Sequence, residues 1–89
     1  MSLHRRAAKR DHVEQAIVDA LEAAGCSVTR ISGRGVPDLL VGRGGRMWLC
    51  EVKAAKGKLT GDQLRWAVNW NGPVPHILRT ADDVIALLR

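Results

Sequence analysis

Two apolar runs separated by a glycine-rich turn place the strongest constraint on how this chain folds. Residues 36–42 (VPDLLVG) and 46–53 (RMWLCEVK) each have the length and composition of a buried β-strand. The glycines between them favour a tight turn, so the two runs predict a β-hairpin. Three charged residues interrupt it, Asp38, Glu51 and Lys53. Charges inside a sheet are costly unless they are paired or hold a metal ion.

The register of the hairpin decides whether these three charges can meet. Side chains alternate between the two faces of a strand, so Glu51 and Lys53 share a face. A two-residue loop at Arg43–Gly44 makes Glu51 the diagonal same-face neighbour of Asp38, and a four-residue loop places the two carboxylates directly opposite each other. A three-residue loop would separate them. The alternative to a functional cluster is a surface ion pair of Lys53 with one carboxylate, worth less than about 1 kcal/mol.

Two adjacent carboxylates at positions 38 and 51 would destabilise the fold if both were charged and no cation lay near them. The two groups repel each other unless one is protonated or a cation lies between them. Mg²⁺ is usually bound by one or two carboxylates, with water and phosphate oxygens completing its shell. A lysine beside the ion could stabilise developing phosphate charge, or orient or deprotonate a water. The hairpin therefore contains a possible metal site with Lys53 next to it.

The remaining segments predict helices and strands on both sides of the hairpin. Apolar residues at helical spacing predict a helix over 10–25, and alternation predicts a strand over 26–32. A second helix over 59–72, a short strand over 74–79 and a final helix over 80–89 follow the hairpin. Strands enclosed by helices in this order predict a single α/β domain with a mixed sheet. A basic segment, 1–10, precedes the first helix.

Two further polar residues could face the charged cluster. Glu14 lies at the edge of the apolar stripe of the first helix, so it is either an inward-facing site residue or a boundary residue. Thr60 to Gln63 forms a T-x-x-Q capping box, which is a sufficient structural role for Gln63. The same position would also place Gln63 at a helix N-terminus, where anions are favoured.

Size and charge narrow the function classes. The chain has 89 residues, a net charge of +5 and a pI near 10.0, which indicates a polyanion partner such as nucleic acid. A simple basic surface is the alternative, and charge alone does not choose between the two. A core this small would gain from self-association. No apolar run approaches the roughly 20 residues of a membrane span and no signal peptide is evident, so we expect a cytoplasmic protein without a membrane partner.

The cysteines, histidines and tryptophans add little specific chemistry. Cys26 and Cys50 lie in apolar stretches and are expected to be reduced core residues. The histidines are scattered and lack zinc-ligand spacing. Trp66 and Trp70, four residues apart on one helix, could stack on bases, but core or interface roles are favoured and partial exposure would suit a dimer seam.

Taken in order, these motifs resemble one known group of enzymes. GVPDLLVG followed by WLCEVKAAKGKLTGDQLRW resembles the PD-(D/E)xK nuclease superfamily, and most closely the compact VRR-NUC branch found in phage and repair proteins. The resemblance runs from Glu14 to about Trp66. An ordered set of helix Glu, G-x-P-D, E-x-K and a Gln on the next helix is far more specific than a lone P-D. It implies a restriction-endonuclease-like αβββαβ core with a mixed central sheet flanked by helices, plus a C-terminal helix.

The resemblance also implies an activity. Relatives are Mg²⁺- or Mn²⁺-dependent nucleases of DNA without an organic cofactor, some acting at branched or flap structures and some as homodimers. This implies a deoxyribonuclease in a bacterial or phage-infected cell. The positions that match the family's metal ligands are Asp38, Glu51 and the backbone carbonyl of Val52, with Glu14 acting directly or through water. The positions that match its catalytic set are Asp38, Glu51, Lys53, Glu14 and Gln63.

Basic residues around these motifs would then hold the DNA backbone, giving salt-sensitive binding with little sequence preference. The expected contacts are Arg5, Arg6, Lys9, Arg10, Arg34, Lys56, Lys58 and Arg65. One alternative is a basic nucleic-acid-binding module on a nuclease-like fold without activity. Another is a small interaction subunit that uses the tryptophan face. A pure binder needs no acidic pair facing a phosphate, so the acidic pair favours the nuclease.

Overall fold

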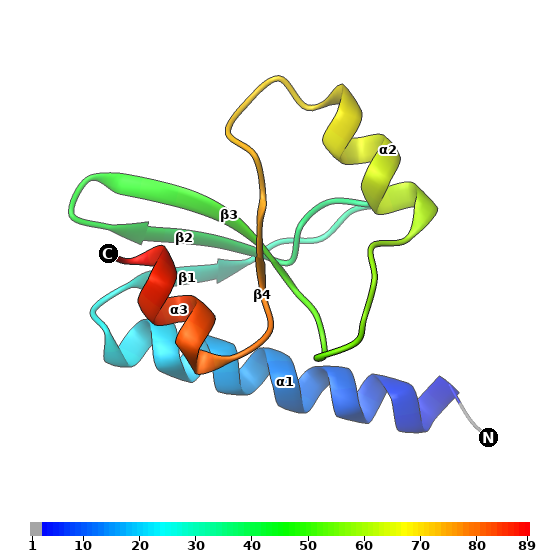
Figure 1. The fold of residues 1–89 in the computed structure, drawn as a ribbon, viewed down its shortest axis with the longest axis horizontal. Coiled ribbons are helices and arrows are strands. Elements are labelled where there is room, and N and C mark those ends of the chain that lie inside the picture. Colours follow the sequence, from blue (N-terminus) through cyan, green and yellow to red (C-terminus); the bar gives the residue numbers. More distant parts are fainter. Residues whose placement is uncertain (1–2) are drawn as a thin grey trace.

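The computed structural model describes residues 3–89, with side chains described from residue 11 onward. These residues form a mixed sheet with helices on both sides (Figure 1). Along the chain the elements are α1 (Leu3–Ala23), β1 (Ser27–Arg30), β2 (Leu39–Arg43), β3 (Arg46–Val52), α2 (Gly61–Asn69), β4 (His76–Leu78) and α3 (Ala81–Leu87). The predicted order of elements is confirmed. Helix α1 begins well before the predicted start at residue 10, because the preceding Ala, Arg and Lys residues are good helix formers.

The sheet has the strand order β1-β2-β3-β4 and is mixed, as predicted. Strand β2 pairs antiparallel with both β1 and β3, whereas β4 pairs parallel with β3. Helices α1 and α3 contact each other and cover one face of the sheet (Figure 1). The main buried residues of this core are Ile17, Val18, Leu21, Leu39, Val41, Cys50, Val52, Leu78 and Val84.

The β2–β3 turn fixes the hairpin register. Arg43 pairs with Arg46, so the loop is the two-residue stretch Gly44–Gly45, and both glycines have positive φ (58° and 79°). This conformation is the type I′ turn that suits the twist of a hairpin. The pairing of Leu39 with Cys50 places position 38 opposite position 51. This is the register of the four-residue-loop alternative, but the loop has only two residues because the ladder continues to Arg43 and Arg46. The two-residue loop considered at Arg43–Gly44 does not form.

Helix α2 lies apart from the main core, and none of its residues is buried (Figure 1). It approaches the chain between β1 and β2 at Gly35, whose φ is +77°. A Cβ atom at Gly35 would lie 2.3 Å from the carbonyl oxygen of Asp62. Only glycine permits this approach, so Gly35 allows α2 to dock beside the start of β2.

Both cysteines are free and buried, as expected of reduced core residues. Burial raises the pKa of the Cys50 thiol to about 12, so this thiol stays protonated and unreactive at neutral pH. None of the described helices combines the length and the apolar character needed to cross a membrane.

Candidate active site

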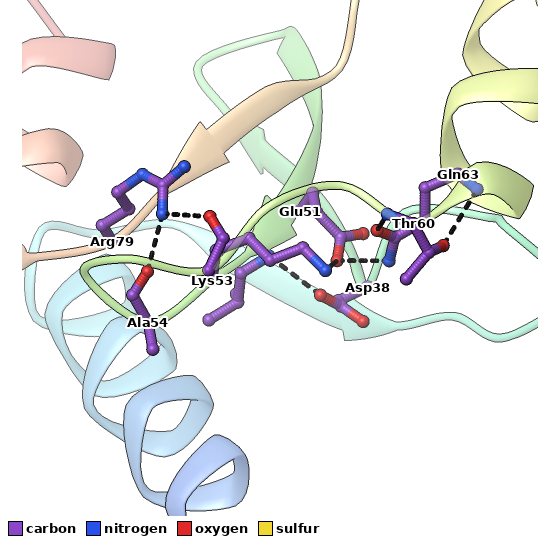
Figure 2. A network of polar contacts seen from close by, with 9 residues as sticks. Asp38, Glu51, Lys53, Ala54, Thr60, Gln63 and Arg79 are labelled. Carbon is purple, nitrogen blue, oxygen red and sulfur yellow. Dashed lines mark hydrogen bonds and ion pairs between the residues drawn. The ribbon is translucent and has the colours of Figure 1, made fainter.

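Asp38 and Glu51 lie together where β2 begins and β3 ends (Figure 2). Both are buried, with 8% and 3% of their surface exposed. The backbone N–H of Val52 donates a 2.8 Å hydrogen bond to Oδ2 of Asp38, which ties the carboxylate to the adjacent strand. Two acidic side chains in such a small domain are rarely buried without a specific partner. Their burial therefore makes this end of the hairpin the candidate site.

Two side chains contact the same oxygen of Glu51. Gln63 donates from Nε2 to Oε2 of Glu51 at 2.8 Å, and the Lys53 ammonium lies 3.5 Å from this oxygen (Figure 2). The Lys53 side chain is itself only 15% exposed. The structure thus brings together four of the predicted catalytic residues, Asp38, Glu51, Lys53 and Gln63.

The environment of Glu51 favours its protonated form. Burial, the charge of Asp38 and a side-chain hydrogen bond with Asp38 together raise the pKa of Glu51 from 4.5 to about 7. Lys53 opposes these effects by its charge and its hydrogen bond without cancelling them. The pair therefore holds a proton up to near neutral pH unless another cation replaces it.

Gln63 forms the predicted helix cap and also contacts Glu51. Its Oε1 accepts a 2.8 Å hydrogen bond from the Thr60 N–H, and Thr60 Oγ1 accepts from the Gln63 N–H, so the predicted capping box is present. Because the backbone N–H requires an acceptor, the amide nitrogen of Gln63 is left facing Glu51. The cap of α2 thereby fixes the donor that holds Glu51.

Glu14 occupies the rim of the site. It lines a hollow of about 740 Å³ that also contains Asp38, Gln63 and Arg34. Its Oε2 accepts a 2.9 Å hydrogen bond from Nε of Arg30, and a second nitrogen of this guanidinium donates to Gln15. Arg30 was not predicted as a site residue, although strand alternation places it on the α1 face. Glu14 thus lines the hollow while it is paired with Arg30, and its role in the site stays a prediction.

The oxygen donors at this end of the hairpin fit a hard divalent cation. Mg²⁺ and Mn²⁺ favour carboxylate and carbonyl oxygens, and Mg²⁺ needs only one or two carboxylates from the protein. Asp38 and Glu51 provide two such carboxylates, and their burial together means that added positive charge would stabilise them. Among the described side chains, no cluster of three or more His, Cys, Asp or Glu residues has metal-binding geometry. A two-carboxylate site is therefore the type that the described residues support.

Comparison with known proteins places this geometry in a family. No family model matches the chain, and no curated protein matches it significantly. A solved structure described as a VRR_NUC domain matches with a TM-score of 0.73 and 31% identity, covering 90% of this chain and 94% of that one. The chain belongs to the VRR-NUC family. This branch of the PD-(D/E)xK nucleases has the restriction-endonuclease-like fold predicted above, and membership implies a nuclease.

In this VRR-NUC domain Arg79, which was not among the predicted site residues, holds the loop that follows β3. Its Nη1 donates to the carbonyls of Ala54 (2.6 Å), Gly57 (2.7 Å) and Ala55 (3.4 Å) (Figure 2). The Lys53 N–H also donates to the carbonyl of Leu78, the residue before Arg79. No motif indicates Arg79, but the parallel pairing of β4 with β3 places it beside the loop.

Removing this guanidinium should loosen the loop and weaken catalysis. We expect Arg79→Gln to reduce cleavage roughly tenfold and to lower the free energy of unfolding by about 1–3 kcal/mol, because several carbonyls lose a charged donor. Cleavage rates and hydrogen exchange at residues 54–57 would measure both effects. Arg43→Gln, at the exposed hairpin turn, is the matched control. Unchanged exchange at 54–57 in Arg79→Gln would contradict the role.

The predicted DNA-contacting residues of the VRR-NUC domain lie in different places. Lys56 and Lys58 are exposed on the loop that Arg79 holds. Arg34 and Arg65 are exposed near α2, and both are ion-paired with Asp62. The side chains of Arg5, Arg6, Lys9 and Arg10 lie outside the described residues, so their roles stay predictions.

Proposed function

We propose that this VRR-NUC domain is a Mg²⁺- or Mn²⁺-dependent deoxyribonuclease that hydrolyses phosphodiester bonds. The observation that carries the proposal is the burial of Asp38 and Glu51 side by side, with the Lys53 ammonium 3.5 Å from Glu51. A site built only to hold DNA would gain nothing from two carboxylates facing a phosphate, because they repel it.

Each residue of the candidate site has a distinct role in this reaction. Asp38, Glu51 and the Val52 carbonyl would hold the divalent ion, and Gln63 keeps the Glu51 carboxylate in place. When bound, the ion supplies Lewis-acid stabilisation of phosphate charge and lowers the pKa of water. The Lys53 ammonium is placed to stabilise negative charge on the phosphate or the attacking oxygen. Lys56 and Lys58 on the adjacent loop would hold the backbone of the DNA.

A cleavage panel tests this function. Single-stranded, duplex, flap and branched DNA would be incubated with Mg²⁺, with Mn²⁺ and with EDTA. We expect cleavage with either metal and none with EDTA, and a preference for branched or flap DNA. Salt-sensitive binding without cleavage under every condition would favour the alternative, a basic binding module on the nuclease fold.

We further propose that the domain acts as a homodimer. Large apolar side chains are exposed on α2, on the segment after it and on β4, namely Leu64, Val68, Val74 and Ile77. An exposed apolar patch of this kind is typical of an association surface. Light scattering over a concentration series should give twice the mass of the chain, and a constant monomer mass would exclude the dimer.

A further inference from the structure

A second hollow, of about 530 Å³, lies next to the candidate active site on the outer side of α2. Its lining residues are Arg34, Asp62, Arg65, Trp66, Asn69 and Trp70. Arg34 and Asp62 also line the hollow that contains Asp38 and Gln63. The two hollows therefore adjoin at Arg34 and Asp62, and a molecule that passes over these two side chains would contact both hollows. None of the roles described so far uses the tryptophans and asparagine found here.

The aromatic part of this hollow is preorganised. The rings of Trp66 and Trp70 stack with their centroids 4.9 Å apart and an interplanar angle of 18°. Trp70 Nε1 donates to the carbonyl of Pro73 at 3.0 Å, and a Cβ at Gly72 would lie 2.5 Å from the Trp70 ring. The chain after α2 thus folds back closely against Trp70. Trp70 nevertheless remains 41% exposed, so a fixed ring system is presented to solvent.

The polar part of the hollow carries positive charge beside these rings. Asp62 accepts from Nε of Arg34 at 3.1 Å and from Nη2 of Arg65 at 2.6 Å. One carboxylate thus orients two guanidinium groups, which leaves one net positive charge. Their side chains are 84% and 72% exposed, and each guanidinium has further N–H donors for a phosphate. Asn69, which donates to the Arg65 carbonyl, also offers a side-chain oxygen.

This combination fits an unpaired nucleotide. Aromatic side chains bind bases by stacking without regard to sequence, guanidinium groups bind the phosphate, and an amide can bind a base edge. A continuous duplex keeps its bases stacked inside the helix and offers no free ring. A second protein copy fits the opposite side of α2 better. At about 100° per residue, Leu64 and Val68 lie roughly half a turn from Asp62 and Trp66, and they are apolar.

We propose that the hollow at Trp66, Trp70 and Arg34 binds one unpaired nucleobase of the DNA whose adjoining phosphate enters the site at Asp38 and Glu51. The proposal rests on the nuclease function proposed above and adds a binding subsite to it. Through this subsite, the domain would recognise the junction between duplex and single strand.

The test measures binding without cleavage. Duplexes carrying one unpaired 2-aminopurine at a flap junction, and matched fully paired duplexes, would be titrated with the protein in EDTA. We expect quenching of the unpaired 2-aminopurine by stacking. We expect roughly tenfold weaker binding of the flap DNA by Trp70→Leu, with the paired duplex unaffected. Trp70→Phe, which keeps a ring, should restore most of the affinity.

Controls separate this subsite from an interface and from general charge. Val68→Ala, on the other side of α2, should leave flap binding unchanged. Arg34→Gln should weaken flap binding several-fold without changing the fold of α2, so a test remains if the tryptophan variant does not fold. Equal affinity for flap DNA in wild type, Trp70→Leu and Arg34→Gln would overturn the subsite. A Trp70→Leu variant with an altered oligomeric mass but unchanged affinity for flap DNA would overturn it as well. Because no metal is present, a protein that never cleaves DNA could still pass this test.

Discussion

Replacing Asp38 with asparagine is expected to reduce cleavage on the order of a thousand-fold or more while leaving the fold intact. Asparagine has almost the same shape, and its side-chain oxygen can still accept the hydrogen bond from the Val52 N–H. What it loses is the negative charge that would hold the divalent ion. Without that charge, the stabilisation of the phosphate transition state is lost.

Two measurements make the Asp38→Asn result specific. Thermal unfolding and DNA affinity in EDTA should be close to those of wild type, with affinity equal or slightly higher because one negative charge facing the phosphate is gone. Asp82→Asn, the same change at an exposed position in the first turn of α3, should retain full activity. A folded Asp38→Asn protein that cleaves DNA at the wild-type rate would show that the active site lies elsewhere.

The hairpin and its charges were predictable because strand periodicity is strict. Once 36–42 and 46–53 are recognised as paired strands, the alternation of side chains places Glu51 and Lys53 on the same face of the sheet. Loop length decided the register. Gly44 and Gly45 together adopt the positive φ values of a type I′ turn, and a Gly-Gly pair indicates such a turn in sequence. The order of helices followed from hydrophobic spacing and, for α2, from the capping box at Thr60, both of which are local signals.

The long-range contacts of the site could not be read from these local signals. Arg79 contacts a loop more than twenty residues earlier in the chain, and Arg30 pairs with Glu14 across a helix and a strand. Such pairs depend on which surfaces the tertiary fold brings together. The capping box at Thr60 explained Gln63 locally, yet its amide also reaches Glu51, because α2 docks at Gly35. The role of a residue in the site and its role in the fold therefore coincide here.

Replacing Glu51 with glutamine is expected to stabilise the metal-free protein at pH 8 even though it abolishes cleavage. Burial and the neighbouring Asp38 raise the pKa of Glu51 from 4.5 to about 7. The folded state therefore binds more protons than the unfolded state between these values, and stability falls as pH rises through this range. Glutamine remains uncharged, so the loss does not occur, and Gln63 can still donate to its side-chain oxygen.

The size and sign of this effect can be measured by thermal unfolding in EDTA. At pH 8 the variant should be more stable than wild type by on the order of 2–3 kcal/mol, which for a chain of this length is a rise in Tm of roughly 10 °C or more. At pH 4.5 the difference should almost vanish, because wild-type Glu51 is then protonated in the folded state. Adding Mg²⁺ at pH 8 should stabilise wild type and have little effect on the variant, since the ion replaces the proton as the charge between the carboxylates. The contradicting result is a stability difference between wild type and Glu51→Gln that is the same at pH 4.5 and pH 8. It would mean that the two buried carboxylates do not repel each other, and the case for a metal site between them would fail.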